Sequence, residues 1–277
     1  MCQECGCGLG GDVKYHGASD GRESHAAAHH HDHGHGHGHG HEPAGPHHHS
    51  HDAEPTSAAR ILSVQQSLLD RNARLASENR GFFRAKNLLV INVLSAPGSG
   101  KTTFIQKTAE LLRGRLRVGV IVGDLATDND AVRLRESGIP VVQITTGTLC
   151  HLEAEMVAKA MAGLDLSALD VLIIENVGNL VCPASYDLGE SLRVVLLSVT
   201  EGEDKPLKYP PLFHSADIAV VTKCDLGAAA GFQRDTALAN LHRISHHAQV
   251  FEVSARTAQG MEEWCAWLVS RRNTHAK

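Results

Sequence analysis

The chain has 277 residues and a formal net charge of −5, and 14 of its 20 His lie within the first 51 residues. The absence of a basic stripe argues against a nucleic-acid partner, and the absence of an apolar run near 18 residues argues against membrane insertion. Because the N-terminus does not resemble a signal peptide, we expect a cytoplasmic protein whose seven Cys are metal ligands, reactive thiols or core residues rather than disulfides.

Residues 1–55 consist largely of His, Gly, Asp, Glu and Ala, with almost no large apolar side chains. Such a segment cannot bury enough apolar surface to offset a backbone ordering cost of roughly 1–2 kcal/mol per residue. We therefore predict a disordered, metal-binding tail. Within it, residues 29–51 carry 12 imidazoles, which offer many weak sites suited to storing metal ions but not to selecting one.

The tail begins with a Cys-x-x-Cys-Gly-Cys motif formed by Cys2, Cys5 and Cys7. Thiolates bind soft or borderline cations, and three of them on a short loop suit Ni(II), particularly if removal of Met1 frees an α-amine as a further ligand. The spacing permits Zn²⁺ as well.

A helix is predicted over the linker 56–85, because apolar residues recur there at helical spacing. We expect it to start at Thr56 or Ser57, to end at Gly81, and to be amphipathic. The apolar positions are Ile61, Leu62, Val64, Leu68, Leu69 and Leu75.

From residue 86 onward, runs rich in Val, Ile and Leu alternate with helical stretches. Continuous apolar runs separated by crossover-length segments predict a mostly parallel sheet with both faces covered. We assign residues 86–277 to one three-layer α/β domain. The predicted strands are 88–94, 118–122, 141–144, 171–174, 194–199, 218–221 and 250–253.

Residues 95–103, Ser-Ala-Pro-Gly-Ser-Gly-Lys-Thr-Thr, connect the first of these strands to a helical pattern. The glycines allow a tight turn in which backbone N–H groups face an anion, as in a phosphate-binding loop (P-loop). Lys101 is expected to reach the terminal phosphates and assist catalysis, and Thr102 to ligate Mg²⁺. The motif departs from the usual pattern only at Ser95, where a Gly is typical. The predicted phosphate-binding residues are Gly98, Ser99, Gly100, Lys101, Thr102 and Thr103.

Two carboxylates end predicted strands at the same sheet edge. Asp124 is our prediction for the group that orients the attacking water, with Asp128 and Asp130 as alternatives. Glu175 is predicted to sense Mg²⁺ or water. The competing interpretation is that these carboxylates cap the helices that follow.

The base is predicted from Thr222-Lys-Cys-Asp225, which follows the strand 218–221. Asp225 can accept hydrogen bonds from two guanine donors that adenine lacks, and the stem of Lys223 can cover the base. The Thr stands where many G proteins have Asn. After the last strand, Ser254-Ala255 offers a backbone N–H for the guanine carbonyl oxygen. We therefore predict GTP as the nucleotide.

A second metal motif combines Cys150-His151, at the opening of a helical segment 149–162, with Cys182, seven residues after Glu175. Loops after such a strand are often ordered by the nucleotide, so a metal there would sense nucleotide state. Three ligands leave a site to be completed by water or by a second subunit, and core packing of both Cys is the alternative. We expect Cys224 and Cys265 to pack internally.

These motifs, together with Gly-Asp-Leu-Ala-Thr-Asp-Asn-Asp-Ala and Glu-Asn-Val-Gly-Asn-Leu-Val-Cys-Pro, resemble those of the HypB family, GTPases that help insert nickel into the large subunit of [NiFe]-hydrogenase. The resemblance covers nearly the whole chain. It implies a SIMIBI-type P-loop GTPase domain and strengthens the assignment of Asp124.

The resemblance further implies a high-affinity nickel site at Cys2, Cys5 and Cys7. It implies a second site, for nickel or zinc, at Cys150, His151 and Cys182. The implied partners are a second copy of the chain on GTP or metal binding, a zinc-containing HypA-like nickel chaperone, and the hydrogenase large-subunit precursor.

Three other interpretations of the sequence remain. A metal-buffering protein is suggested by the His tract, and the urease-type nickel GTPases share the phosphate loop and often a His-rich tail. The N-terminal thiols and Cys150-His151 favour the hydrogenase relatives. A P-loop small-molecule kinase would leave Asp225 and both metal motifs unexplained.

Overall fold

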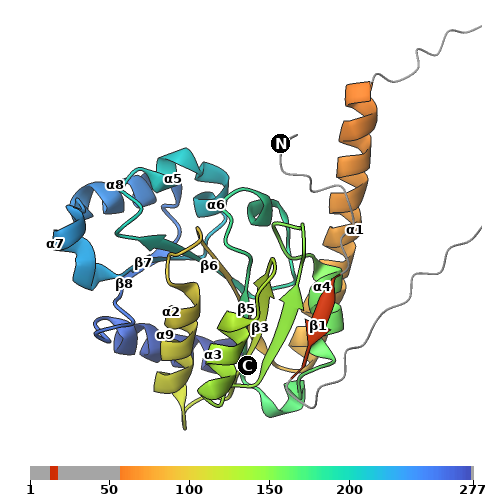
Figure 1. Ribbon diagram of the computed structural model, residues 1–277, viewed down its shortest axis with the longest axis horizontal. Coiled ribbons are helices and arrows are strands. Elements are labelled where there is room, and N and C mark those ends of the chain that lie inside the picture. Colours follow the sequence, from red (N-terminus) through yellow and green to blue (C-terminus); the bar gives the residue numbers. More distant parts are fainter. Residues whose placement is uncertain (1–12, 18–56, 276–277) are drawn as a thin grey trace, which may run out of the picture.

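The computed structural model describes residues 13–17 and 57–275, which form a sheet with helices on both faces (Figure 1). The sheet has eight strands in the order β1-β4-β3-β5-β2-β6-β7-β8. All strand pairs are parallel except β1 with β4. The predicted three-layer, mostly parallel α/β architecture is confirmed.

All seven predicted strands are present, with small differences at their ends. Each except β8 coincides with a run of mainly apolar residues that is buried on both faces of the sheet, whereas β8 lies at the sheet edge and leaves Val250 38% exposed. The strands are β2 (Leu89–Leu94), β3 (Val118–Asp124), β4 (Val141–Thr145), β5 (Val171–Glu175), β6 (Leu192–Ser198), β7 (Ile218–Thr222) and β8 (Gln249–Glu252).

The helices divide between the two faces of the sheet (Figure 1). Helices α2, α3 and α9 pack on one face, α1 and α4 cover part of the other, and α6 and α8 cover the rest of it. The helices are α1 (Ser57–Ala85), α2 (Lys101–Leu112), α3 (Asn129–Glu136), α4 (Ala154–Met161), α5 (Lys205–Lys208), α6 (Pro210–His214), α7 (Gly227–Ala230), α8 (Arg234–Ile244) and α9 (Met261–His275).

An additional strand, β1 (Lys14–His16), lies within the segment that we predicted to be a disordered tail. It pairs antiparallel with β4 and thereby extends the sheet. Val13 and Tyr15 pack against the cluster that α1 and α4 cover. The prediction was wrong here, because composition averaged over the tail concealed a short stretch of alternating apolar residues.

Helix α1 passes through Gly81 without interruption, so the predicted end at that residue was wrong. The buried stripe also differs from the predicted one, since Val64 and Leu68 are 57% and 52% exposed. In Figure 1, α1 runs beside α4 and extends beyond the rest of the domain. Among the side chains of α1 that the structure describes, the buried ones are Asn72, Ala76, Asn79 and Phe83.

The two buried asparagines explain why an apolar pattern missed this stripe. The Asn72 side chain accepts a hydrogen bond from the Ala154 N–H (2.8 Å) and donates to the Asp187 carbonyl oxygen (2.7 Å). The Asn79 amide donates to the carbonyl oxygens of Ala154 (2.9 Å) and Leu188 (3.1 Å). These bonds satisfy polar backbone groups at the start of α4 and in the loop before β6.

The strand order changes direction at β2, which lies between β5 and β6. In open parallel sheets, ligands bind at the carboxyl ends of strands beside such a switch point. The carboxyl ends of β2, β3, β5 and β7 carry the residues predicted to act on the nucleotide. No helix in the described part of the chain has the length and apolar character needed to cross a membrane.

Candidate functional site

The loop between β2 and α2 has the backbone of a phosphate cradle. Gly98 and Gly100 have φ angles of 73° and 95°, which side chains with a Cβ rarely adopt. Gly100 caps α2, whose first residues, Lys101 and Thr102, are buried. The loop therefore presents a helix N-terminus and successive N–H groups, the arrangement that binds a phosphate.

Lys101 lies folded against its own loop. Its Nζ donates to the Ser95 hydroxyl (3.0 Å) and to the Ala96 carbonyl oxygen (3.5 Å). Burial lowers the pKa of Lys101, and the carboxylate of Glu175 opposes that effect. Ser95, which departs from the usual motif, is fully buried and hydrogen-bonded within the loop, so it fits where a Gly is typical.

Glu175 contacts the helix residue that was predicted to ligate Mg²⁺. The Thr102 hydroxyl donates to Glu175 Oε1 (2.7 Å), while the second carboxylate oxygen, Oε2, is buried with no hydrogen-bond partner. Burial raises the pKa of Glu175 to about 7, against the opposing effects of Lys101 and Thr102. An orphaned carboxylate oxygen beside a hydroxyl and a phosphate cradle fits Mg²⁺, a cation that prefers oxygen ligands.

The substitution Glu175→Gln is expected to stabilise the nucleotide-free protein at high pH relative to wild type. The folded protein keeps a proton on Glu175 up to about pH 7, whereas the unfolded chain releases it near pH 4.5. The stabilising contribution of this carboxyl group is therefore complete below pH 4.5 and is lost as pH rises through 7. The shift corresponds to on the order of 3 kcal/mol.

Urea unfolding of both proteins in EDTA at several pH values tests this expectation. The difference in unfolding free energy between variant and wild type should grow from pH 4.5 to pH 8. A difference that is the same at both ends of that range would show that Glu175 is ionised in the folded state throughout.

The aspartates after β3 lie near the phosphate cradle. Asp124 is partly buried, and its Oδ1 accepts hydrogen bonds from the N–H groups of Ala126 and Thr127, both at 3.0 Å. Asp128 precedes α3 without capping it through its side chain, and Asp130 lies 3.6 Å from Arg133. Asp124 thus stabilises its own turn, and its predicted role toward water stays a prediction.

The residues predicted to read the base line one cavity with the phosphate loop. Lys223, Asp225, Ser254 and Ala255 all border it. Ser99, Gly100 and Thr103 border the same cavity from the phosphate loop. Arg256 and Leu226, which sequence reasoning missed, are also part of its wall. The exposed carboxylate of Asp225 thus lies in the wall of the cavity that the phosphate loop borders.

Two side chains tie the base loop to the phosphate loop. The Thr222 hydroxyl donates to the Ser99 carbonyl oxygen (2.9 Å), and Lys223 Nζ donates to the Gly98 carbonyl oxygen (2.7 Å). A hydroxyl at the first position of the motif therefore suffices to hold the two loops together. Lys223 itself has a φ of 58°, which turns its stem across the cavity toward Gly100.

The second metal motif forms a cluster. The ligand atoms of Cys150, His151 and Cys182 all lie within 4.8 Å of one another. His151 is buried, and its Nδ1 lies 4.0 Å from the Cys150 sulfur. Core packing alone does not describe these residues, because both Cys are partly exposed. Two thiolates and an imidazole form a donor set that suits nickel or zinc.

Cys150 and His151 lie in the loop before α4, not in the helix as predicted. The helix begins only at Ala154, because the loop backbone is held by other groups: the Asn176 side chain accepts from the Leu152 N–H (3.2 Å), and Asn179 donates to the Cys150 carbonyl oxygen (3.4 Å). A loop can bring two consecutive side chains to one ion, whereas a helix directs neighbours about 100° apart.

Sequence reasoning missed the groups that surround the imidazole. The ring of Tyr186 stacks on His151 with centroids 3.8 Å apart, and Glu153 Oε1 lies 3.5 Å from His151 Nε2. A carboxylate beside the second ring nitrogen is the usual way to orient a metal-binding His. Glu153 could have been predicted as a neighbour of His151 because it lies two residues after it in the sequence. Nothing in the sequence indicates that Tyr186 lies beside His151.

The remaining sulfur predictions divide into two groups. Cys265 is fully buried and Cys224 is partly buried with its thiol directed at the Val221 carbonyl oxygen, as expected. Burial raises the pKa of Cys265 to about 11. The predicted ligands Cys2, Cys5 and Cys7, together with the His tract, lie outside the described residues.

Comparison with known proteins agrees with this geometry. Residues 89–252 match the family model for the CobW/HypB/UreG nucleotide-binding domain. The hydrogenase maturation factor HypB of Azotobacter vinelandii is 49% identical over 221 residues, which are 80% of this chain and 73% of that protein. The Escherichia coli K12 HypB is 45% identical over 216 residues, or 78% of this chain and 74% of the relative.

Two solved structures share the fold. The crystal structure of Helicobacter pylori HypB in complex with nickel has a TM-score of 0.71 and 38% identity, covering 75% of this chain and 97% of that one. The Archaeoglobus fulgidus HypB structure has a TM-score of 0.69 and 38% identity, covering 73% and 99%. The chain therefore belongs to the CobW/HypB/UreG family of P-loop nucleotide-binding proteins and, within it, to the HypB hydrogenase maturation factors.

Proposed function

We propose that this protein is a GTP-hydrolysing nickel metallochaperone that delivers Ni(II) to the large-subunit precursor of [NiFe]-hydrogenase. The observation that carries the proposal is the position of the Cys150, His151 and Cys182 cluster. Cys182 lies on the segment that follows β5, and β5 ends in Glu175, which is bonded to Thr102 in the phosphate loop. A proposed metal ligand and a proposed nucleotide-site residue thus both lie at or just after the carboxyl end of β5. The nickel complex of the H. pylori relative supports the choice of metal.

Hydrolysis requires charge stabilisation and a positioned water molecule. Lys101 would leave the Ser95 hydroxyl to bind the terminal phosphates, and Thr102 would ligate Mg²⁺, with Glu175 beside it. When bound, Mg²⁺ supplies positive charge that stabilises the transferring phosphoryl group. Asp124, at the carboxyl end of β3, would orient the attacking water. Asp225 selects guanine, and Ser254 and Ala255 flank the base.

Nickel is the cargo in this proposal, and it binds both in the tail and in the nucleotide-binding domain. Cys2, Cys5 and Cys7 form a high-affinity site in the tail, and residues 29–51 act as a reservoir of weaker imidazole sites. The Cys150, His151 and Cys182 site accepts nickel or zinc. Its three ligands leave a coordination position for water or for the same cluster of a second copy.

The chain is proposed to form a homodimer when GTP or metal binds, and to receive help from a HypA-like zinc-containing nickel chaperone. It would act in the cytoplasm, where thiols stay reduced and can serve as metal ligands. Hydrolysis would change the dimer interface and so the affinity of the Cys150, His151 and Cys182 site.

Phosphate release from GTP and from ATP by the full chain, with Mg²⁺ present, tests the enzymatic part. We expect turnover of GTP, no comparable turnover of ATP, and a loss of about 100-fold or more in Lys101→Ala. Preferential turnover of ATP would contradict the proposal. Equal turnover in wild type and Lys101→Ala would indicate a contaminating hydrolase.

A further inference from the structure

The three metal-ligand residues come from two segments that are distant in sequence. Cys150 and His151 lie in the loop between β4 and α4, whereas Cys182 opens the short 3-10 helix Cys182–Ser185 after β5. A metal site binds well only if its ligands are held at the coordination distance before the ion arrives. The structure must therefore contain groups that fix one segment relative to the other.

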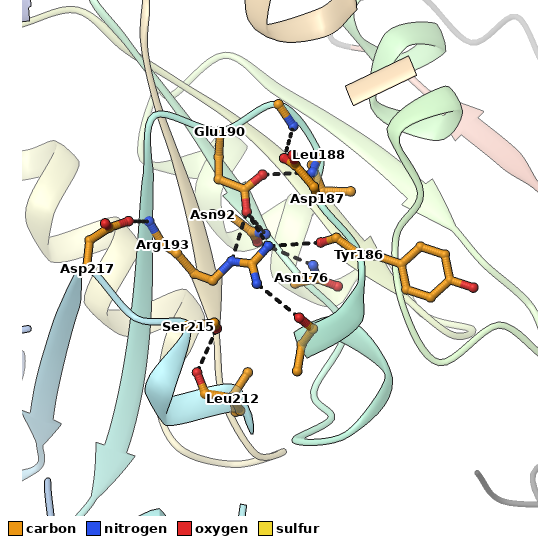
Figure 2. A network of polar contacts seen from close by, with 12 residues as sticks. Asn92, Asn176, Tyr186, Asp187, Leu188, Glu190, Arg193, Leu212, Ser215 and Asp217 are labelled. Carbon is orange, nitrogen blue, oxygen red and sulfur yellow. Dashed lines mark hydrogen bonds and ion pairs between the residues drawn. The ribbon is translucent and has the colours of Figure 1, made fainter. Parts of the chain in front are cut away.

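Arg193 on β6 holds the segment that carries Cys182. Its guanidinium donates from Nη1 to the Ala184 carbonyl oxygen and from Nη2 to the Tyr186 carbonyl oxygen, both at 3.1 Å (Figure 2). The Arg193 side chain is only 13% exposed. Because a guanidinium is a rigid planar fork, two carbonyl oxygens bound to it are fixed relative to each other.

Glu190 orients this guanidinium. Its Oε1 accepts hydrogen bonds from Arg193 Nε (3.0 Å) and Nη2 (2.8 Å), and its Oε2 accepts one from the Leu188 N–H (2.7 Å). The Glu190 side chain is 6% exposed. A buried ion pair of this kind is weak evidence for stability, because desolvation offsets most of the Coulomb attraction. The geometry of the Glu190–Arg193 pair therefore says more about its role than its contribution to stability does.

The same network reaches the other half of the metal site. The Asn92 amide donates to Glu190 Oε1 (3.1 Å), and the Asn176 amide donates to Asn92 Oδ1 (3.3 Å). Asn176 Oδ1 accepts from the N–H of Leu152, the residue after His151 (3.2 Å). Both asparagines are fully buried, and Figure 2 shows them close to the Arg193 guanidinium.

The two halves also meet directly through Tyr186. Arg193 binds the Tyr186 carbonyl oxygen, and the Tyr186 ring stacks on the His151 imidazole at 3.8 Å. The hydrogen bond from Arg193 thus fixes the backbone of Tyr186, and the stacked Tyr186 ring fixes the plane of the His151 ring. A substitution at Arg193 would therefore shift Cys182 through the backbone of its segment and His151 through the stacked ring of Tyr186.

We propose that Arg193 is a positioning residue for the Cys150, His151 and Cys182 metal site. With Glu190, it holds the segment of Cys182 at the distance from His151 that a shared ion requires. This inference rests on the proposed function, since it assumes that the cluster binds metal. The guanidinium itself touches neither the metal ligands' side chains nor the nucleotide cavity.

The test uses the full chain with Cys2, Cys5 and Cys7 changed to Ser, titrated with Ni²⁺ against a competing chelator. Thiolate-to-metal charge transfer provides the signal, because the imidazoles of the tail do not produce it. Among the described residues, neither Cys224 nor Cys265 belongs to a group of three or more potential metal ligands, whereas Cys150 and Cys182 do, so the band reports on Cys150 and Cys182.

Three variants are compared in this background, with GDP affinity measured in each. Arg193→Gln should bind Ni²⁺ about 10- to 100-fold more weakly, the usual effect of losing a group that orients a ligand. Arg193→Lys keeps the charge and one donor direction and should fall between Gln and the parent. The matched control is Arg117→Gln, which breaks an exposed pair with Asp170 at the opposite end of the sheet. It should bind Ni²⁺ like the parent.

The outcomes separate the two proposals. If the parent shows no thiolate band with Ni²⁺, the metal site of the proposed function is refuted. If the parent binds but Arg193→Gln binds equally well, Arg193 has no positioning role. Should Arg193→Gln fail to fold or lose GDP affinity, Arg193→Lys decides: weaker Ni²⁺ binding with unchanged GDP affinity supports the inference, and unchanged Ni²⁺ binding overturns it.

Discussion

Replacing Asp225 with Asn is expected to lower affinity for guanine nucleotides by roughly 10²- to 10⁴-fold. The Asp225 carboxylate borders the base cavity, where it would accept two hydrogen bonds from guanine. Hydrogen bonds to a charged group contribute about 1.5–3 kcal/mol each, and about 1.4 kcal/mol corresponds to a tenfold change. The Asn amide keeps one acceptor oxygen, but its NH₂ group would face an N–H donor of guanine, so one of the two hydrogen bonds is replaced by a repulsive contact.

Displacement of a fluorescent GDP analogue measures this effect. The control is Asp235→Asn, because the side chain of Asp235 is 97% exposed on α8 and does not line the cavity. Xanthine carries an acceptor where guanine carries its amine, so Asp225→Asn should gain affinity for xanthosine diphosphate. Unchanged GDP affinity in Asp225→Asn would show that the base binds elsewhere.

Replacing Cys182 with Ser is expected to weaken Ni²⁺ binding at the second metal site by at least about 100-fold. The substitution removes one of three ligands, and loss of a ligand should exceed the 10- to 100-fold effect of losing an orienting group. A hydroxyl is a poor substitute because it is neutral and hard where a thiolate is charged and soft. GDP affinity should be unchanged, since Cys182 does not line the base cavity.

The measurement is the thiolate charge-transfer titration with Ni²⁺ in the full chain lacking Cys2, Cys5 and Cys7. Cys265→Ala is the matched control, because this thiol is buried between α9 and α2 and is distant from the cluster in the fold. Equal Ni²⁺ affinity in Cys182→Ser and the parent would exclude Cys182 as a ligand, and an effect of Cys265→Ala would show that the signal is not specific.

The sheet and the phosphate loop could be predicted from the sequence because local signals specify them. Buried parallel strands are continuous apolar runs, and the loop is defined by glycines that must adopt positive φ, such as Gly98 and Gly100. Ser95 shows the limit of such a pattern, since a buried, hydrogen-bonded Ser replaces a Gly there without loss of the loop's shape.

The errors lie where tertiary contacts override local patterns. Helix α1 buries Asn72 and Asn79 and leaves the predicted apolar residues Val64 and Leu68 exposed, because the two amides satisfy backbone groups of α4 and of the loop before β6. The burial of a polar side chain can be predicted only when its hydrogen-bond partners are known. For β1, the alternation of Val13 and Tyr15 is a local signal, but the β4 edge that the strand pairs with is distant in the sequence.

For the candidate site, the sequence predicted residues that the structure brings close together, but it did not predict the groups that hold them. Cys150, His151 and Cys182 do gather, yet the helix predicted to carry the first two begins later, at Ala154. The supports of the cluster, among them Asn176, Tyr186 and Arg193, come from other strands and loops. Their roles depend on distances across the sheet edge, which spacing along the chain does not report.

Residues 175–182 connect, over a short stretch of chain, a residue at the proposed nucleotide site with a residue of the proposed metal site. Glu175 accepts a hydrogen bond from Thr102, and the next residue, Asn176, accepts one from the loop that carries His151. The same segment continues to Cys182. A nucleotide that displaces Glu175 would move the start of this segment. We therefore expect the bound nucleotide to alter the Ni²⁺ affinity of the metal site.

The most direct test is the Ni²⁺ affinity of the full chain lacking Cys2, Cys5 and Cys7, measured with Mg²⁺ and either GDP or a non-hydrolysable GTP analogue. Coupling between two sites is typically about 5- to 150-fold, and we predict a difference in Ni²⁺ affinity within that range, which Cys182→Ser abolishes. The same Ni²⁺ affinity with both nucleotides would contradict the account.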